Sequence, residues 1–212
     1  MRNCVWLSLV MFALGCGGSS DANAPAAVVP LAINGPSRVD NSNGISDPNP
    51  TEGSDNSIVE QLYQKAQQAA RAGQSAAAVE AISQAIGEEP DDARLFRLRA
   101  DVYSVMGKYA NARADLALAV RIEPQNAELR NIRGYFLMSR GLTKEALVDF
   151  DQALELNPEF TAAWNNRGLV HLAHQDYQAA VTDFGKAATI DGTYADALNN
   201  RGFAKFKMGQ LS

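Results

Sequence analysis

The sequence predicts an all-α protein made of stacked antiparallel helix pairs. From Ile58 onward, apolar residues recur three and four positions apart, which is the spacing of one face of a helix. Pro90, Pro124 and Pro158 follow similar sequences and lie 34 residues apart. A period of this length accommodates two helices and two turns, and one such pair cannot bury its apolar face alone. We therefore expect consecutive pairs to stack around one continuous core.

Residues 1–16 have the anatomy of an export signal. Arg2 precedes an apolar run that is too short to span a bilayer. The run closes with the letters ALGC, which resemble the lipobox of bacterial lipoproteins, although Leu is more common than Ala at the position of Ala13. The resemblance implies cleavage before Cys16 and attachment of lipid to this residue. The alternative is cleavage near Gly15 that leaves Cys16 unmodified.

Lipidation would place the protein in the bacterial cell envelope, on the periplasmic side of a membrane. Gly17 rather than Asp follows the cysteine, which favours the outer membrane if enterobacterial sorting rules hold. The only other cysteine, Cys4, lies in the segment predicted to be removed, so we expect no disulfide in the folded part. Residues 17–57 are rich in Gly, Ser, Asn, Asp, Pro and Ala without periodicity, and we expect a disordered tether there.

The remaining segment, 58–212, consists of similar units, numbered so that Pro90 occupies position 32. Positions 20 and 27 are alanine in all four complete units, position 24 is always large and apolar, and position 8 is Ala or Gly. This combination of period, small residues and proline resembles the tetratricopeptide repeat. The resemblance implies an α-solenoid, a right-handed superhelix of antiparallel helix pairs with about four and a half repeats. The units start at Val59, Ala93, Ala127, Thr161 and Ala195, and the last unit is incomplete.

Several positions of the unit also have a local explanation. Small residues at positions 8 and 20 allow the two helices of a pair to approach closely. Position 15 suits a left-handed residue at the end of the first helix and is glycine in four units, whereas the fourth unit has Gln175. The proline at position 32 cannot continue the second helix, and Asn126 is well placed to cap the next one.

Nothing in the sequence indicates catalysis. It contains no glycine-rich phosphate loop, no GxSxG and no HExxH motif, so we expect no enzyme activity and no cofactor. His171 and His174 are close enough on one predicted helix to share a metal, but no acid or cysteine completes a usual ligand set nearby, and a structural role is favoured. The net charge of -5 is spread along the chain without a basic patch, so we expect no nucleic-acid partner.

Two charged series follow the repeat. Arginine recurs at position 7 and aspartate at position 23. We expect each arginine to bridge to an aspartate of a second helix, because bidentate pairs of this kind suit partly buried helix interfaces. The partner could belong to the same unit or to the preceding one, and a binding surface is the alternative interpretation. The residues are Arg99, Arg133, Arg167, Arg201, Asp115, Asp149 and Asp183.

The family resemblance implies that the first helices line a concave groove, with positions 2, 5, 6, 9, 12 and 13 facing a ligand. These positions have a basic start, an amide middle and an aromatic end. An Asn side chain both donates to and accepts from a peptide backbone, so the amides suit an extended peptide. The alternative is that the sequence Asn-Asn-Arg-Gly is only a solvated variant of the repeat. The candidate groove residues are Arg94, Arg97, Asn131, Tyr135, Asn165, Asn166, Leu169, Asn199, Asn200, Phe203 and Phe206.

Some tetratricopeptide proteins hold the acidic C-termini of chaperones with a clamp of Lys and Asn at set positions. This sequence lacks those residues, so that function is not implied. The corresponding pairs are Tyr63 and Gln67, Arg97 and Asp101, and Asn131 and Tyr135.

The functional hypothesis is a non-enzymatic scaffold of the bacterial envelope that binds a protein or peptide in its groove and is held at the membrane by a lipid anchor. Two alternatives stay open. The chain could be a truncated or accessory module of a larger envelope protein or enzyme complex. It could also be a structural protein that associates with itself through its C-terminal helix, where Phe203, Phe206 and Leu211 interrupt a polar surface.

Overall fold

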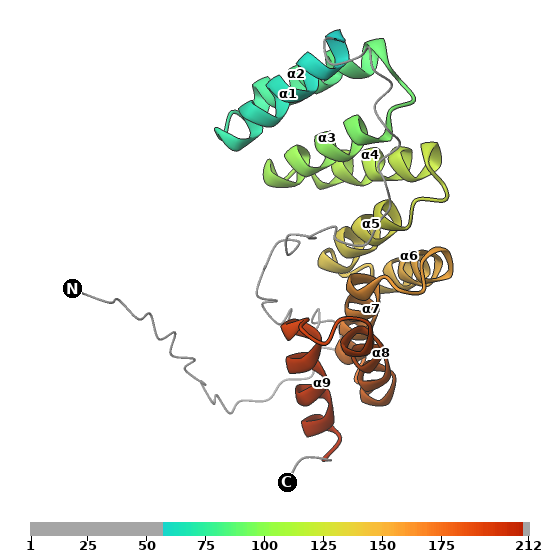
Figure 1. The fold of residues 1–212 in the computed structure, drawn as a ribbon. Coiled ribbons are helices and arrows are strands. Elements are labelled where there is room, and N and C mark those ends of the chain that lie inside the picture. Colours follow the sequence, from blue (N-terminus) through green and yellow to red (C-terminus); the bar gives the residue numbers. More distant parts are fainter. Residues whose placement is uncertain (1–56, 210–212) are drawn as a thin grey trace, which may run out of the picture. The chain divides into compact units, whose positions relative to one another are not determined.

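The computed structural model describes residues 57–209, which form nine α-helices and no strand (Figure 1). The expected export signal, Cys16 and nearly all of the expected tether lie outside the described residues. The helices are α1 (Ile58–Arg71), α2 (Ser75–Glu88), α3 (Ala93–Val105), α4 (Tyr109–Ile122), α5 (Ala127–Ser139), α6 (Thr143–Leu156), α7 (Thr161–Ala173), α8 (Tyr177–Ile190) and α9 (Ala195–Lys207).

The helices form consecutive pairs, as the period predicts. α1 packs on α2, α3 on α4, α5 on α6 and α7 on α8, and α9 is the first helix of a fifth unit that packs on α8. The pairs follow one another in a stack (Figure 1). The expected all-α solenoid of about four and a half tetratricopeptide-type repeats is therefore confirmed.

The turn inside each unit uses a residue with positive φ. Gly73, Gly107, Gly141 and Gly209 have φ between 71° and 76°, so the predicted role of position 15 is confirmed. Gln175 adopts the same conformation, with a φ of 63°, although it carries a side chain. The amide of the following residue, Asp176, donates to the carbonyl of His171 at 2.9 Å and satisfies a free carbonyl at the end of α7.

The alanines at positions 20 and 27 lie where helices meet. All eight are completely buried. The residue at position 24 is also buried in every unit and packs beside position 8 of its own first helix. The larger residues at position 24 oppose the smaller ones at position 8: Phe150 and Phe184 face Gly134 and Gly168, whereas Ile82 and Leu116 share buried clusters with Ala66 and Ala100.

The first helices of neighbouring units contact one another directly, α1 with α3, α5 with α7 and α7 with α9. We call the surface that α1, α3, α5, α7 and α9 form together the first-helix face. Asn126 caps α5, because its Oδ1 accepts from the amide of Leu129 at 3.0 Å, as predicted. None of the described helices combines the length and the apolar character needed to cross a membrane.

Candidate binding surface

The predicted basic start of the first-helix face is neutralised by acidic side chains. Arg94 lies 2.7 Å from Asp92 and 3.8 Å from Glu60, and its guanidinium lies 5.5 Å from the centre of the Tyr63 ring. The hydrogen bonds that the Arg94 guanidinium donates to the Asp92 carboxylate raise the pKa of Arg94 above its ordinary value. Arg97 lies 3.5 Å from Glu128 of the next first helix. These arginines therefore connect neighbouring units and do not form a free basic patch.

Asp101 lies one helical turn after Arg97 on the same face. Water reaches its side chain, yet the protein atoms around it desolvate the carboxylate and raise its pKa, and the nearby Arg97 opposes this shift. A carboxylate in this setting favours a ligand group that donates a hydrogen bond.

The amides in the middle of the face form hydrogen bonds between units. Asn166 Nδ2 donates to Asn131 Oδ1 at 3.0 Å, and Asn200 Nδ2 donates to Asn165 Oδ1 at 3.1 Å. Asn131 and Asn165 are buried, with exposed fractions of 8% and 5%. The buried residue of each pair therefore holds the next first helix in place, and its oxygen is already used within the protein.

Asn199 differs from the other position-5 asparagines. It is exposed, and no side-chain hydrogen bond joins it to another described residue. Among residues 57–209, no side chain pairs with its donor and acceptor atoms. Asn166 and Asn200 use only their Nδ2 groups, as donors, in the described contacts.

Aromatic side chains gather at the C-terminal end of the face. Phe203 and Phe206 on α9 are 50% and 61% exposed, which is unusual for residues of this size. The ammonium of Lys207 lies 5.4 Å from the centre of the Phe203 ring. Tyr135 is half-buried, and Leu169 packs partly into the cluster around Phe184. The exposed apolar area of the candidate site is thus concentrated on α9.

The arginine and aspartate series pair within the unit. Arg99 with Asp115, Arg133 with Asp149 and Arg167 with Asp183 each form two parallel hydrogen bonds of 2.5 to 2.8 Å. These hydrogen bonds raise the pKa of all three arginines, against the opposing effect of burial. The expected bridges are confirmed for these three arginines, with the aspartate supplied by the same unit, whereas Arg201 has no aspartate partner within residues 57–209.

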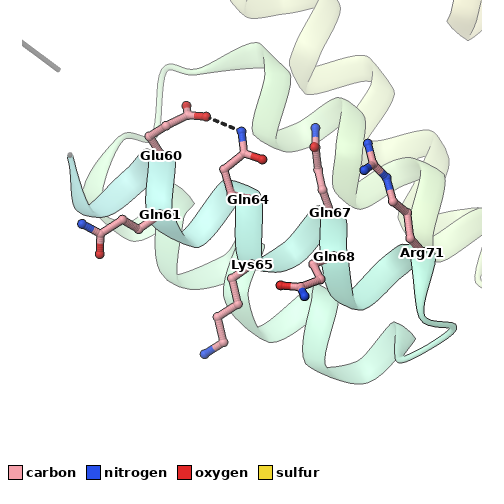
Figure 2. Close-up of a pocket in the computed structure, with 7 residues that line it drawn as sticks. All are labelled: Glu60, Gln61, Gln64, Lys65, Gln67, Gln68 and Arg71. Carbon is pink, nitrogen blue, oxygen red and sulfur yellow. Dashed lines mark hydrogen bonds between the residues drawn. The ribbon is translucent and has the colours of Figure 1, made fainter. Parts of the chain in front are cut away.

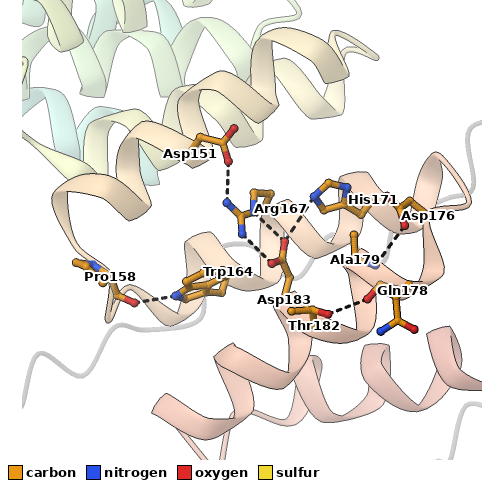
Figure 3. A network of polar contacts seen from close by, with 10 residues as sticks. All are labelled: Asp151, Pro158, Trp164, Arg167, His171, Asp176, Gln178, Ala179, Thr182 and Asp183. Carbon is orange, nitrogen blue, oxygen red and sulfur yellow. Dashed lines mark hydrogen bonds and ion pairs between the residues drawn. The ribbon is translucent and has the colours of Figure 1, made fainter.

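Two of these arginines also reach the preceding unit. The third nitrogen of Arg167, Nη1, donates to Asp151 of α6 at 2.7 Å, as Figure 3 shows. In the same way, Arg99 Nη1 donates to Ser83 of α2 at 3.3 Å. The series therefore helps to join units as well as the two helices of one unit.

Sequence reasoning missed the contacts of position 4. Trp164 Nε1 donates to the carbonyl of Pro158 at 2.7 Å, and Arg130 donates to the carbonyl of Pro124 at 2.7 and 3.0 Å. Position 4 thus fixes the turn that contains the proline of position 32. The signal in the sequence was partial, because a side chain with an N–H group stands at position 4 in two of the three units that follow a proline of position 32, whereas Phe96 stands there after Pro90.

The two histidines contact different groups. His171 Nε2 lies 3.8 Å from Asp183 Oδ2 (Figure 3), whereas His174 Nε2 lies 2.9 Å from Thr143 Oγ1 of α6. Within residues 57–209, no three side chains of the usual metal-ligating types come together.

A shallow hollow runs along α1 (Figure 2). It is lined by α1 alone, and Gln64 Nε2 donates to Glu60 Oε1 at 2.7 Å along its edge. A surface with walls from one helix cannot enclose a small molecule. The lining residues are Glu60, Gln61, Gln64, Lys65, Gln67, Gln68 and Arg71.

Comparisons with solved structures give the same fold. MamA from Desulfovibrio magneticus RS-1 superposes with a TM-score of 0.64 at 16% identity, covering 72% of this chain and 86% of that one. PilW, described as a widely conserved type IV pilus biogenesis factor, gives 0.65 at 23% identity and covers 74% and 72%. YrrB, described as a protein with an unusual peptide-binding site, gives 0.58 at 22% identity and covers 71% and 78%.

Sequence comparison identifies the family. No curated protein sequence matches the chain significantly. The profile of the tetratricopeptide repeat matches three overlapping segments, 63–127, 97–150 and 137–197, which together span more than half of the chain. Together with the helix pairs and their 34-residue period, this match means that the chain belongs to the tetratricopeptide repeat family.

Proposed function

We propose that this protein is a non-enzymatic scaffold that binds a protein or peptide on its first-helix face. The observation that carries the proposal is the pair of exposed phenylalanines, Phe203 and Phe206, beside the free amide of Asn199. Large aromatic side chains are costly to leave in water and are enriched at binding hot spots. The peptide-binding site described for the structural neighbour YrrB supports the same use of the fold.

The contacts within the face refine which residues take part. Asn131 and Asn165 contribute indirectly, because their side-chain oxygens accept hydrogen bonds from the next first helix and help to hold it in place. Asn199, Asn166 and Asn200 meet the ligand, and an amide side chain can pair with a peptide group through both its N–H and its C=O. A peptide that suits this face therefore offers apolar side chains to Phe203 and Phe206 and an exposed main chain to the asparagine amides.

Location in the cell envelope is a second part of the proposal. The lipobox-like residues before Cys16 support a lipid anchor on the periplasmic side of a membrane, with the outer membrane favoured by Gly17. A tether of some forty residues would then let the scaffold meet partners away from the membrane surface.

Site-specific photocrosslinking in intact cells tests the binding face. A photoreactive phenylalanine analogue is placed at Phe206 in the full chain, and at Val148 as a control. Val148 is 54% exposed but lies on a second helix, α6. We expect a discrete crosslinked protein from position 206 that is absent from position 148 and is reduced when Asn199 is changed to Ala. Identical products from both positions would refute the proposed face.

Fractionation of cells that express the Cys16→Ala chain tests the anchor. Acyl chains on Cys16 would supply strong membrane affinity once the signal is removed, so this variant should move from the membrane to the soluble fraction. A Ser19→Ala chain serves as a control and should stay with the membrane. A Cys16→Ala chain that remains in the membrane fraction would contradict lipid anchoring, without affecting the proposal for the binding face.

A further inference from the structure

Two recurring hydrogen bonds connect consecutive units, and we call the contact between two consecutive units a joint. In the first, which we call the arginine link, position 7 of a first helix donates to position 25 of the preceding second helix. Arg167 forms it with Asp151 (Figure 3), and Arg99 forms it with Ser83. In the second, which we call the amide link, position 6 donates to position 5 of the preceding first helix, as in the two asparagine pairs described above.

The joint between the second and third units has neither link. Arg133 stands at position 7, but the preceding second helix has Ala117 at position 25, and alanine has no side-chain acceptor. Ile132 stands at position 6 and cannot donate a hydrogen bond to position 5, where Arg97 stands. Each of the other three joints within residues 57–209 has at least one of the two links.

Arg133 retains the nitrogen that the arginine link uses. Its Nε and Nη2 atoms donate to Asp149 of the same unit, as the corresponding atoms of Arg167 do to Asp183. Nη1 of Arg167 reaches the preceding unit, whereas Nη1 of Arg133 has no hydrogen-bond partner among the described residues. The missing part of the link is therefore the acceptor at position 117 and not the donor.

The helices also pack least closely at this joint. α1 with α3, α5 with α7 and α7 with α9 contact one another directly, whereas α3 and α5 approach each other least among the neighbouring first helices. The contact of α4 with α5 is likewise the smallest between a second helix and the next first helix. The joint lies in the middle of the stack, where α4 is followed by α5 (Figure 1).

Apolar side chains hold the two units together at this joint. Leu129 of α5 is buried in the cluster around Phe96. Ile132 and Phe136 of α5 pack against the cluster around Leu116. Apolar burial depends on the area removed from water and is non-directional, whereas a hydrogen bond requires a particular angle between its groups. These contacts therefore keep the units in contact without fixing the angle between them.

The polar contacts across this joint lie at the surface of the protein. The ion-paired side chains are 43% to 55% exposed, and ion pairs of this kind contribute little and weaken in salt. The amide links of the later joints, in contrast, use a buried asparagine as the acceptor. Within residues 57–209, the contacts of this joint are Arg113 with Glu145 at 2.7 Å, Arg97 with Glu128 at 3.5 Å, and Arg140 over the Tyr109 ring at 4.1 Å.

We propose that the joint between the second and third units is a hinge about which the stack changes its curvature. The first two units move as one body and the later units as the other, because their own joints retain the links. Bending at the hinge changes the separation of α3 and α5, which carry Asp101 and Tyr135 on the first-helix face. The proposal concerns the free protein and does not depend on ligand binding at that face.

Pulsed EPR between two nitroxide labels measures the movement. The labels are attached to cysteines that replace Glu80 of α2 and Val148 of α6, two exposed residues at the same repeat position on either side of the hinge. The full chain is used, with Cys4 and Cys16 changed to Ser so that no other thiol reacts. We expect a broad distribution of distances. Raising NaCl from about 0.1 M to about 1 M should broaden it further, because salt screens the exposed ion pairs.

Ala117→Asp should narrow the distribution, because it gives Arg133 the acceptor that position 25 supplies at the next joint. Ala117 is exposed, so this substitution should not disturb the fold. Ala117→Leu controls for a larger side chain at the same position and should not narrow the distribution. Gly185→Asp adds an aspartate at position 25 of the fourth unit, outside the labelled segment, and should also leave the distribution unchanged.

Three outcomes would overturn the proposal. The first is a distribution in the labelled chain that is already as narrow as that of Ala117→Asp, which would mean that apolar packing fixes the joint. The second is equal narrowing by Ala117→Leu or by Gly185→Asp, which would mean that the arginine link does not restrain this joint. The third is a width that does not respond to salt, which would mean that the exposed ion pairs do not limit the movement.

Discussion

α7 and α9 contain the same Asn-Asn-Arg-Gly sequence in different surroundings. In α7 the first asparagine, Asn165, is buried. Arg167 forms a bidentate pair with Asp183, and the Phe184 ring covers Gly168. In α9 the asparagine is exposed, and neither the arginine nor the glycine has a described partner. The comparison teaches that a repeat position has no fixed role, because its neighbours decide whether it contributes stability or remains available for binding.

The arginine pair should give the largest difference between the two helices. Arg167→Gln should lower the free energy of unfolding by about 3 kcal/mol, because it leaves the buried Asp183 carboxylate without its partner. Arg201→Gln should change it little. Urea unfolding followed by circular dichroism measures both. Equal losses would mean that Arg201 is paired in solution.

The second largest difference in stability should come from the two glycines of the motif, Gly168 and Gly202. Gly168→Ala should destabilise the protein by about 1 to 3 kcal/mol, because the new Cβ would lie 2.7 Å from the Phe184 ring. Gly202→Ala meets open space and should be neutral or stabilise α9 by up to about 1 kcal/mol through helix propensity. Thermal unfolding of both variants checks this order, and a loss of stability in Gly202→Ala would show that the site is covered.

Of the two position-5 asparagines, Asn165 should affect stability, whereas Asn199 should affect binding. Asn165→Ala removes the acceptor of the Asn200 hydrogen bond and should cost about 1 kcal/mol. Asn199→Ala should leave the unfolding midpoint unchanged but reduce capture of the partner at the first-helix face. An Asn199→Ala protein that crosslinks normally through position 206 would remove this residue from the site.

Gln175 is the position of this comparison at which α7 is the less favourable helix. The left-handed residue that follows α9 is Gly209, whereas the one that follows α7 is Gln175 at a φ of 63°, where a side chain is strained. Gln175→Gly should therefore raise the free energy of unfolding by about 1 kcal/mol. The reverse change at the equivalent position, Gly141→Gln, should lower it by a similar amount. The prediction fails if both substitutions act in the same direction.

The sequence alone predicted the repeat architecture because the same pattern of small residues, turn residues and helical spacing recurs in each unit. The buried alanines, the glycine turns and the cap at Asn126 follow from local rules that need no knowledge of neighbouring units. The candidate site was harder to predict, because its residues depend on contacts between units. Asn131 and Asn166 both lie on the predicted face, yet only the packing of α5 on α7 reveals that one is buried beneath the other.

The same limit applied to the charges. Arg94 and Arg97 were predicted as a basic start of the groove, but their acidic partners, Glu60 and Glu128, stand on other helices and were not paired with them in advance. The arginine series could be paired with aspartates by residue type, whereas the choice between units required the structure. The sequence of one unit therefore predicts which residue types pair, but it does not predict which helix supplies the partner.

Native-state hydrogen exchange on the full chain tests most directly the claim that no helix within residues 57–209 covers α9 as α8 covers α7. The amides of Ala195–Lys207 should exchange much faster than those of Thr161–Ala173, because one side of α9 meets no described partner. Arg167→Gln should accelerate exchange in α7, and Arg201→Gln should leave α9 unchanged. Equal protection of α7 and α9 in a strictly monomeric sample would contradict the account.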